Sequence, residues 1–187
     1  GAARYVEGQV MVVHAGRYTG ALIRGVLPEE EIKVSELHNT LEQTESLEIA
    51  LQNGEFGIVL GADLASYLGA IAGDKIMVIT PEASVTPMGF VPRVKRFTVT
   101  GVFRFGMYQF DRNLAIMHAS DSARLFKMGD GFSGVRLKLS DTGRAPIVAR
   151  ELAREFSFDK YVSDWTQQNA NYFLAVKMEK TMMFIIL

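Results

Sequence analysis

The sequence contains no cysteine among its 187 residues. This absence excludes thiolate nucleophiles, zinc sites built from cysteine, and disulfide bonds. It does not identify the compartment, because both the cytosol and a bacterial periplasm accommodate proteins that lack disulfides.

A surplus of charge of one sign is also missing. The chain has 20 Lys and Arg residues against 21 Asp and Glu residues, and its formal net charge is -1. A nucleic-acid-binding domain normally carries a strong basic excess, and binding to an anionic membrane surface needs a cluster of basic residues. We therefore expect neither nucleic acid nor a polybasic membrane patch.

The glycine motifs of common enzyme classes are missing too. The segment 131–134 reads Gly-Phe-Ser-Gly and lacks the spacing of a hydrolase nucleophile elbow. The segment 73–75 is a turn into a strand rather than a phosphate-binding loop, and Gly54, Gly57 and Gly61 do not form a dinucleotide fingerprint. No residue can be nominated as catalytic or as a cofactor ligand.

The three histidines are far apart, at His14, His38 and His118. None has a histidine or carboxylate partner at the helical spacing of metal ligands, so we interpret them as structural and expect no metal. Because catalytic triads are assembled in space, these absences do not exclude an enzyme, and a soluble hydrolase stays an alternative.

What is present is a large apolar fraction, 48% of the residues. This is enough for one domain or for two small subdomains. The apolar run Met182–Leu187 is either the start of a membrane span or a buried terminal helix, and the preceding charges of Lys177, Glu179 and Lys180 favour the span.

Alternating and periodic patterns predict strands and helices in mixed order. A helix after Gly61 carries Asp63 in its first turn and ends at Gly69 or Gly73, and an acidic loop covers 29–31. The other expected helices cover 121–127 with Ser120 as N-cap, begin at Pro146, and follow Asp164 as N-cap. The expected strands are 6–14, 19–26, 57–61, 75–80, 94–105, 114–117, 134–139 and 161–162. The fold class is therefore α+β, with the strand-rich middle inserted between two flanks that contain strands and helices.

The segment 82–93 is expected to be a long loop between two strands, because Pro81 ends the first strand. It contains Pro87, Met88, Phe90 and Val91. Two interpretations are equally supported by composition: the loop folds back and buries these side chains, or it protrudes and offers them to a partner. Its prolines reduce the entropy lost on docking, and methionine adapts to varied surfaces.

Several segments form a familiar combination: 57–65, Leu68-Gly69, 73–76, the loop core Thr86-Pro87-Met88-Gly89, and the end of the chain from Asp164-Trp165 through Lys180 into the apolar run. Together they resemble the periplasmic domain of the LolC/LolE lipoprotein-releasing permeases. The similarity covers essentially the whole chain. Its Gly-Asp turn alone is unspecific, since it recurs among MacB-like permeases.

The resemblance implies a discontinuous α/β subdomain, called Porter, with an inserted β-rich subdomain, called Sabre. The Porter-like part would comprise 1–72 and 128–174, and the Sabre-like part 73–127. The segment 175–187 would begin a transmembrane helix. The parent protein would be an inner-membrane subunit whose periplasmic domain connects its first and second membrane spans.

The resemblance also implies partners. The parent permease would pair with a second permease (LolC or LolE) and with the LolD ATPase, so that ATP hydrolysis belongs to another chain and this one is not an enzyme. The complex would release lipoproteins from the inner membrane and pass them to the periplasmic chaperone LolA. A MacB-like or FtsX-like permease domain with another periplasmic partner is the alternative.

In this family a protruding hook recruits LolA, and its Thr-Pro-Met-Gly core corresponds to Thr86, Pro87, Met88 and Gly89. The match favours the protruding interpretation of the loop. The hook base commonly has Gln-Arg, whereas this chain has Val94-Lys95, which keeps the charge and loses the amide. The partner-binding residues implied by the resemblance are Val85, Thr86, Pro87, Met88, Gly89, Phe90, Arg93 and Lys95.

Overall fold

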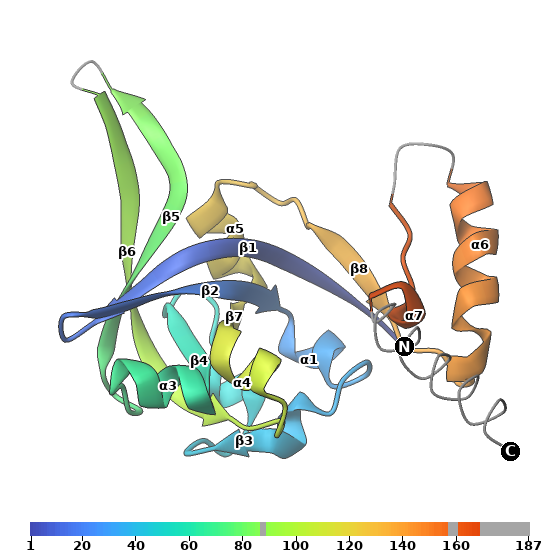
Figure 1. Cartoon of the computed structure of the whole chain (residues 1–187), viewed down its shortest axis with the longest axis horizontal. Helices are drawn as coiled ribbons and strands as arrows, with labels where there is room; N and C mark the ends of the chain where they lie inside the picture. The colour runs from blue at the N-terminus through green and yellow to red at the C-terminus, as the bar shows by residue number, and fades with distance from the viewer. Residues whose placement is uncertain (87–88, 157–160, 169–187) are drawn as a thin grey trace, which may run out of the picture. The chain divides into compact units, whose positions relative to one another are not determined.

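The computed structural model describes residues 1–86, 89–156 and 161–168 (Figure 1). The chain divides into two compact units, Gly1–Lys138 and Leu139–Leu187. The segment 175–187, expected to begin a membrane span, lies outside the described residues. Within the described residues, no helix is both long and apolar enough to cross a membrane. The subdivision into a Porter-like and a Sabre-like part stays a prediction.

The first unit is organised around one sheet. Its strands are β1 (Ala2–His14), β2 (Arg17–Val26), β3 (Leu41–Glu42), β4 (Gly57–Gly61), β5 (Lys75–Thr86), β6 (Gly89–Phe103), β7 (Leu114–His118) and β8 (Gly134–Leu137). The first two form an antiparallel hairpin, whose turn contains Gly16 at a positive φ of 79°. Glycine adopts this left-handed conformation without the steric cost that a side chain would add.

The sheet closes on itself. Its order runs β2-β7-β4-β6-β5-β1, and β1 also pairs with β2, which completes a ring. Two of these contacts, β2 with β7 and β4 with β6, are parallel, and the others are antiparallel. Strand β8 extends the sheet beyond β1, and β3 pairs with the end of β6. Closure leaves no open sheet edge along most of the ring.

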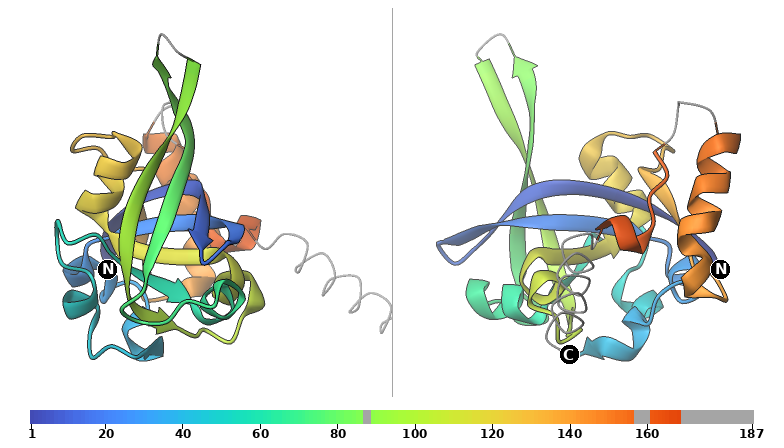
Figure 2. Two further views of the ribbon diagram at one scale, coloured as in Figure 1. Left: turned by 90° about the vertical axis from the view of Figure 1, so that its left-hand side faces the viewer. Right: turned by 45° about the vertical axis from the view of Figure 1, so that its right-hand side comes forward.

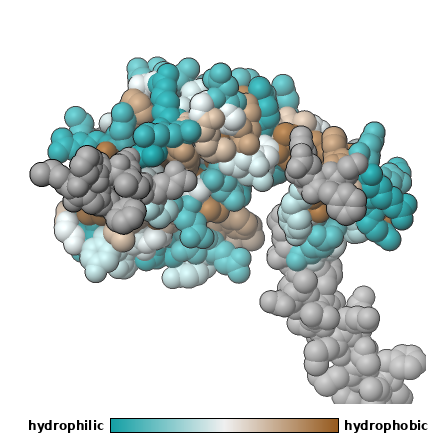
Figure 3. Space-filling view, turned by 90° about the horizontal axis from the view of Figure 1, so that it is seen from above, coloured by the Kyte–Doolittle hydropathy of each residue, from teal (hydrophilic) through white to brown (hydrophobic). Residues whose placement is uncertain are grey.

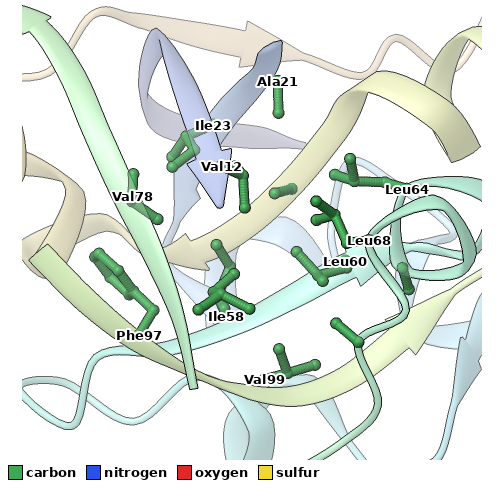
Figure 4. Packing of buried hydrophobic residues seen from close by; sticks show 14 of the residues in the cluster. Val12, Ala21, Ile23, Ile58, Leu60, Leu64, Leu68, Val78, Phe97 and Val99 are labelled. Carbon is green, nitrogen blue, oxygen red and sulfur yellow. The ribbon is translucent and has the colours of Figure 1, made fainter. Parts of the chain in front are cut away.

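The ring encloses the main hydrophobic core. Its side chains come from strands far apart in sequence and point toward one another, as do Val12, Ile23, Ile58 and Phe97 in Figure 4. All of these are at most 1% exposed. Burying one such side chain contributes about 1.5–3 kcal/mol, so the ring is the stable body from which other parts project.

Strands β4 and β7 are buried on both faces. Ile58 and Leu60 of β4 point into the main core, whereas Val59 joins a second cluster with Ile116 and Phe103. This explains why the sequence of β4 is apolar at every position rather than alternating. The buried strand predicted over 57–61 is confirmed.

Short helices connect and cover the strands. They are α1 (Pro28–Glu31), η1 (Leu37–Thr40), α2 (Leu47–Ala50), α3 (Ala62–Leu68), α4 (Tyr108–Asn113), α5 (Ala119–Phe126), η2 (Thr142–Arg144), α6 (Ala145–Glu155) and α7 (Trp165–Gln168). Helix α3 ends as predicted at Gly69, which has a φ of 68°. Helix α6 has its proline in the first turn, and Asp164 accepts hydrogen bonds from the backbone N–H groups of Thr166 and Gln167 at the start of α7.

The predicted α+β fold class is confirmed, but three local predictions outside the segment 82–93 are wrong. The segment 29–31 is not a solvated loop: it lies in α1, where Glu31 is 3% exposed and pairs with Arg136. The N-cap of α5 is His118, whose Nδ1 accepts from the N–H of Ser120, because the helix begins two residues earlier than expected. Residues 161–162 form no strand.

Candidate protein-docking hairpin

The most prominent feature of the first unit is the hairpin of β5 and β6. At its root, Met77–Ile79 of β5 pair with β1, and β6 pairs with β4 from Thr98 onward. Beyond these residues the two strands pair with each other alone among the described strands. We call the part between Thr80 and Arg93 the arm.

The arm extends away from the closed sheet. Figure 1 shows it rising above β1 and β2, and both views in Figure 2 show the same projection. At about 3.3 Å per residue, Thr80–Thr86 spans roughly 20 Å. The prediction that this segment protrudes therefore agrees with the course of the backbone.

The prediction of a loop over 82–93 is wrong, because both strands continue through it. Strand β5 runs to Thr86 and β6 begins at Gly89. The register passes from Thr80 opposite Arg93 to Ala83 opposite Pro92, so Pro81 and Glu82 form a bulge. A bulge tolerates proline, which is why Pro81 does not end the strand.

At the tip, the backbone places four of the predicted partner-binding residues in opposed pairs. Val85 lies opposite Phe90, and Thr86 lies opposite Gly89. Pro87 and Met88, the centre of the predicted motif, lie outside the described residues. Along the chain, only these two residues separate Thr86, the last residue of β5, from Gly89, the first residue of β6.

The remaining two predicted residues lie at the base of the arm. Arg93 is half-buried opposite Thr80, and Lys95 lies opposite Val78. The Lys95 ammonium sits 3.9 Å from the centroid of the Phe56 ring, which in turn packs edge-on against Phe97 at 5.7 Å. A cation–π contact of this kind contributes about 0.5–1 kcal/mol at an exposed position, and it holds the base against the body.

The aromatic support of the arm was not found from sequence. Phe56 is distant from Lys95 along the chain, and no local pattern connects them. Its backbone is fixed by Asp121, a fully buried carboxylate that accepts from the N–H groups of Gly54 and Phe56. The contact depends on the long-range pairing of β4 with β6, which a single sequence does not reveal.

Exposed apolar side chains surround the root of the arm. Met11, Met77 and Val94 are 44%, 38% and 52% exposed, and they come from three adjacent strands. Figure 3 shows hydrophobic areas interrupted by hydrophilic side chains on the face seen from above. This composition suits a protein contact better than a closed substrate cavity.

The arrangement offers no ligand set for a metal. Among the described residues, no three His, Cys, Asp or Glu side chains come together in a way that could hold an ion. His14 instead contacts the carbonyl of Leu68 through Nδ1 at 3.2 Å, and its Nε2 lies 3.6 Å from the Asp74 carboxylate. His118 caps α5. Both residues therefore hold local structure.

Comparison with known proteins gives the family. The model of the MacB-like periplasmic core domain matches residues 1–155. The lipoprotein-releasing system transmembrane protein LolC of Neisseria meningitidis serogroup B is 44% identical over 187 residues, which is all of this chain and 45% of that protein. LolC of Xylella fastidiosa strain 9a5c is 43% identical over the same length and is covered to 44%. The chain thus spans less than half the length of these relatives.

Solved structures support the fold. The extracellular domain of the ABC-type transporter YknZ from Gram-positive bacteria has a TM-score of 0.54 at 11% identity, with 82% of this chain and 72% of that chain covered. The periplasmic region of MacB from Actinobacillus actinomycetemcomitans has a TM-score of 0.51 at 12% identity, with 91% and 74% covered.

These relatives also agree with the prediction that the chain is not an enzyme, since they are transmembrane proteins of a lipoprotein-releasing system. The resemblance to the LolC/LolE permeases is confirmed by identity over the whole chain. The chain belongs to the family of MacB-like periplasmic core domains.

Proposed function

We propose that this chain is the periplasmic domain of an inner-membrane ABC-transporter permease that releases lipoproteins. The identity of 44% to a LolC protein over the full chain carries this proposal. The permease would act with a second permease subunit and a separate LolD ATPase. The domain itself would contribute binding and movement rather than chemistry.

Within that function, we propose that the arm docks the chaperone LolA and so directs the released lipoprotein to it. Three observations support the proposal. The arm projects from a rigid closed sheet, its sequence from Ala83 to Val91 carries no charge, and its base presents Arg93 and Lys95. An uncharged, proline-restricted tip can bury apolar surface at a low entropic cost.

Replacement of Met88 by Glu tests this assignment. A carboxylate placed in an apolar contact must be desolvated, so we expect affinity for purified LolA to fall by about tenfold or more. The measurement is a calorimetric titration of the isolated domain with LolA. Met107→Glu, at a 53% exposed methionine that is the N-cap of α4 and lies beyond the end of β6, is the matched control and should leave binding unchanged. Equal affinities of the two variants would argue against docking through the arm.

The fold also occurs in MacB and YknZ, so a second candidate is a MacB-like or FtsX-like permease domain with a different periplasmic partner. The two candidates make opposite predictions for a pull-down with the isolated domain. Retention of LolA favours lipoprotein release. Retention of another periplasmic protein, with no LolA, favours the second candidate.

A further inference from the structure

The outer edge of β6, on the side away from β5, has no partner strand along the arm among the described strands, and it therefore offers a surface for binding. Strand β6 pairs with β4 only from Thr98 onward, and with β3 only at Val102 and Phe103. Among the strands that the structure describes, nothing pairs with the outer edge of β6 between Gly89 and Phe97. An exposed edge of this length is a template for another strand.

The hydrogen bonds next to the arm determine which backbone groups face this edge. The Val99 N–H donates to the carbonyl of Asp74 at 2.8 Å, so Val99 faces β5. The Thr98 N–H donates to the carbonyl of Phe56 at 3.0 Å, so Thr98 faces the opposite side. Because these directions alternate along an antiparallel strand, Arg96 and Val94 turn their N–H and C=O groups to the free edge.

The same alternation explains the position of a proline. It places Pro92 at the outer edge, where the missing N–H removes no bond to β5. The free donors of the segment 92–96 are therefore the N–H groups of Val94 and Arg96. Their side chains are exposed as well, so a strand could approach without displacing core residues.

The body of the domain defines where such a strand must stop. Phe56 ends the β4 side of the sheet, with its carbonyl bonded to Thr98 and its ring under the Lys95 ammonium. The open stretch thus begins just beyond this ring. Lys95 and Arg96 give it positive charge, so an extended segment that carries acidic residues fits it best.

We infer that the docked partner adds an extended segment to the outer edge of β6 between Pro92 and Arg96, so that main-chain hydrogen bonds fix its register. This inference rests on the proposed function, with the chaperone as partner. Apolar contacts at the tip supply affinity, and the edge supplies orientation. A strand added here would lie beside β6 on the same side as β4, next to the part of β6 that β4 does not pair with.

Val94→Pro tests the inference, because it removes one outward N–H and leaves the bonds between β6 and β5 in place. Val94→Ala is the control, since it shortens the side chain and keeps the N–H. We expect Val94→Pro to bind purified LolA about tenfold more weakly than Val94→Ala, the loss expected when an acceptor is left unpaired. Thermal melting of both variants verifies that they are folded.

Amide hydrogen exchange of the wild-type domain gives a second measurement that needs no substitution. In saturating LolA, exchange at Val94 and Arg96 should slow at least tenfold, while Lys95, already bonded to β5, changes little. If the wild type binds LolA but the two amides stay unprotected and the variants bind equally, the inference is overturned and the proposed function stands. If the wild type does not bind LolA at all, both are overturned.

Discussion

At the scale of single residues, buried polar groups fix the irregular parts of this fold. The Asp111 carboxylate accepts from the N–H groups of Phe105 and Gly106, both at 2.8 Å, and so shapes the turn between β6 and α4. Glu31 is buried beside Arg136 and accepts from the hydroxyl of Ser35. Each bonded carboxylate stabilises a segment whose backbone would otherwise lack partners.

His118 gives the domain a pH-dependent stability. Burial lowers the pKa of His118 from its ordinary value of 6.5, and its neutral Nδ1 accepts from the N–H of Ser120. The unfolded state therefore binds a proton more readily than the folded state. The contribution of His118 is fully present above about pH 6.5 and is lost as the pH falls toward the lower folded pKa.

We accordingly expect the free energy of unfolding to decrease between pH 7.5 and 5.5, by at most about 1.4 kcal/mol per pH unit from this one group. Denaturant unfolding at several pH values measures it. His118→Asn keeps a capping side chain without a titrating ring, and its stability should fall less over the same range. Parallel curves for wild type and variant would contradict the assignment.

At the scale of elements, the two parts of the long β5–β6 hairpin have different roles: the root belongs to the core of the first unit, and the arm projects from it. Its root contributes Val78 and Phe97 to the main core, whereas the arm lies beyond the last pairs with β1 and β4. A two-stranded ribbon contributes little to stability by itself. The arm therefore depends on the body, and the body does not depend on the arm.

Shortening the hairpin tests this independence. Replacing residues 81–92 by Asn-Gly joins Thr80 to Arg93, a pair whose groups face each other, through a favoured two-residue turn. We expect the melting temperature to stay within a few degrees of the wild type, because the two described hydrophobic clusters take all their side chains from other parts of the chain. A fall of more than about 10 °C would show that the arm supports the body. Circular dichroism gives the measurement.

The sequence could predict only those helices and strands that have a local pattern of their own. Strand β4 and helix α3 were predictable because their patterns are local: a continuous apolar run, and an apolar face ended by Gly69. Helices α1 and α2 were missed because four residues show too little periodicity. The arm was predicted as a loop because Pro81 and Pro92 resemble strand breakers, and only the register reveals that one sits in a bulge and the other at an edge.

At the scale of the whole molecule, ring closure could not be predicted, since it depends on pairings between residues distant in sequence, such as Leu22 with Leu114. The candidate site likewise has one part that the sequence could predict and one part that it could not. The motif at its tip was recognisable from Thr86 to Gly89. The support at its base, Phe56 beneath Lys95, required the assembled sheet.

The division into two units predicts that residues 1–138 fold without the remainder. The first unit contains both hydrophobic clusters and every described strand, and β8 closes it by pairing with β1. We expect the truncated chain to unfold cooperatively, with a melting temperature within about 5–10 °C of the full chain. Calorimetry measures this. A broad, non-cooperative transition would mean that the second unit is needed for folding.

The pairing of β1 with β8 has a mechanical consequence. Ala2 lies opposite Leu137, so the two ends of the first unit lie at one corner, while the arm projects from a distant part of the same unit (Figure 1). A body held at one corner turns about that corner as a lever. A small tilt there sweeps the tip of the arm through a far wider arc than the strands beside the pivot.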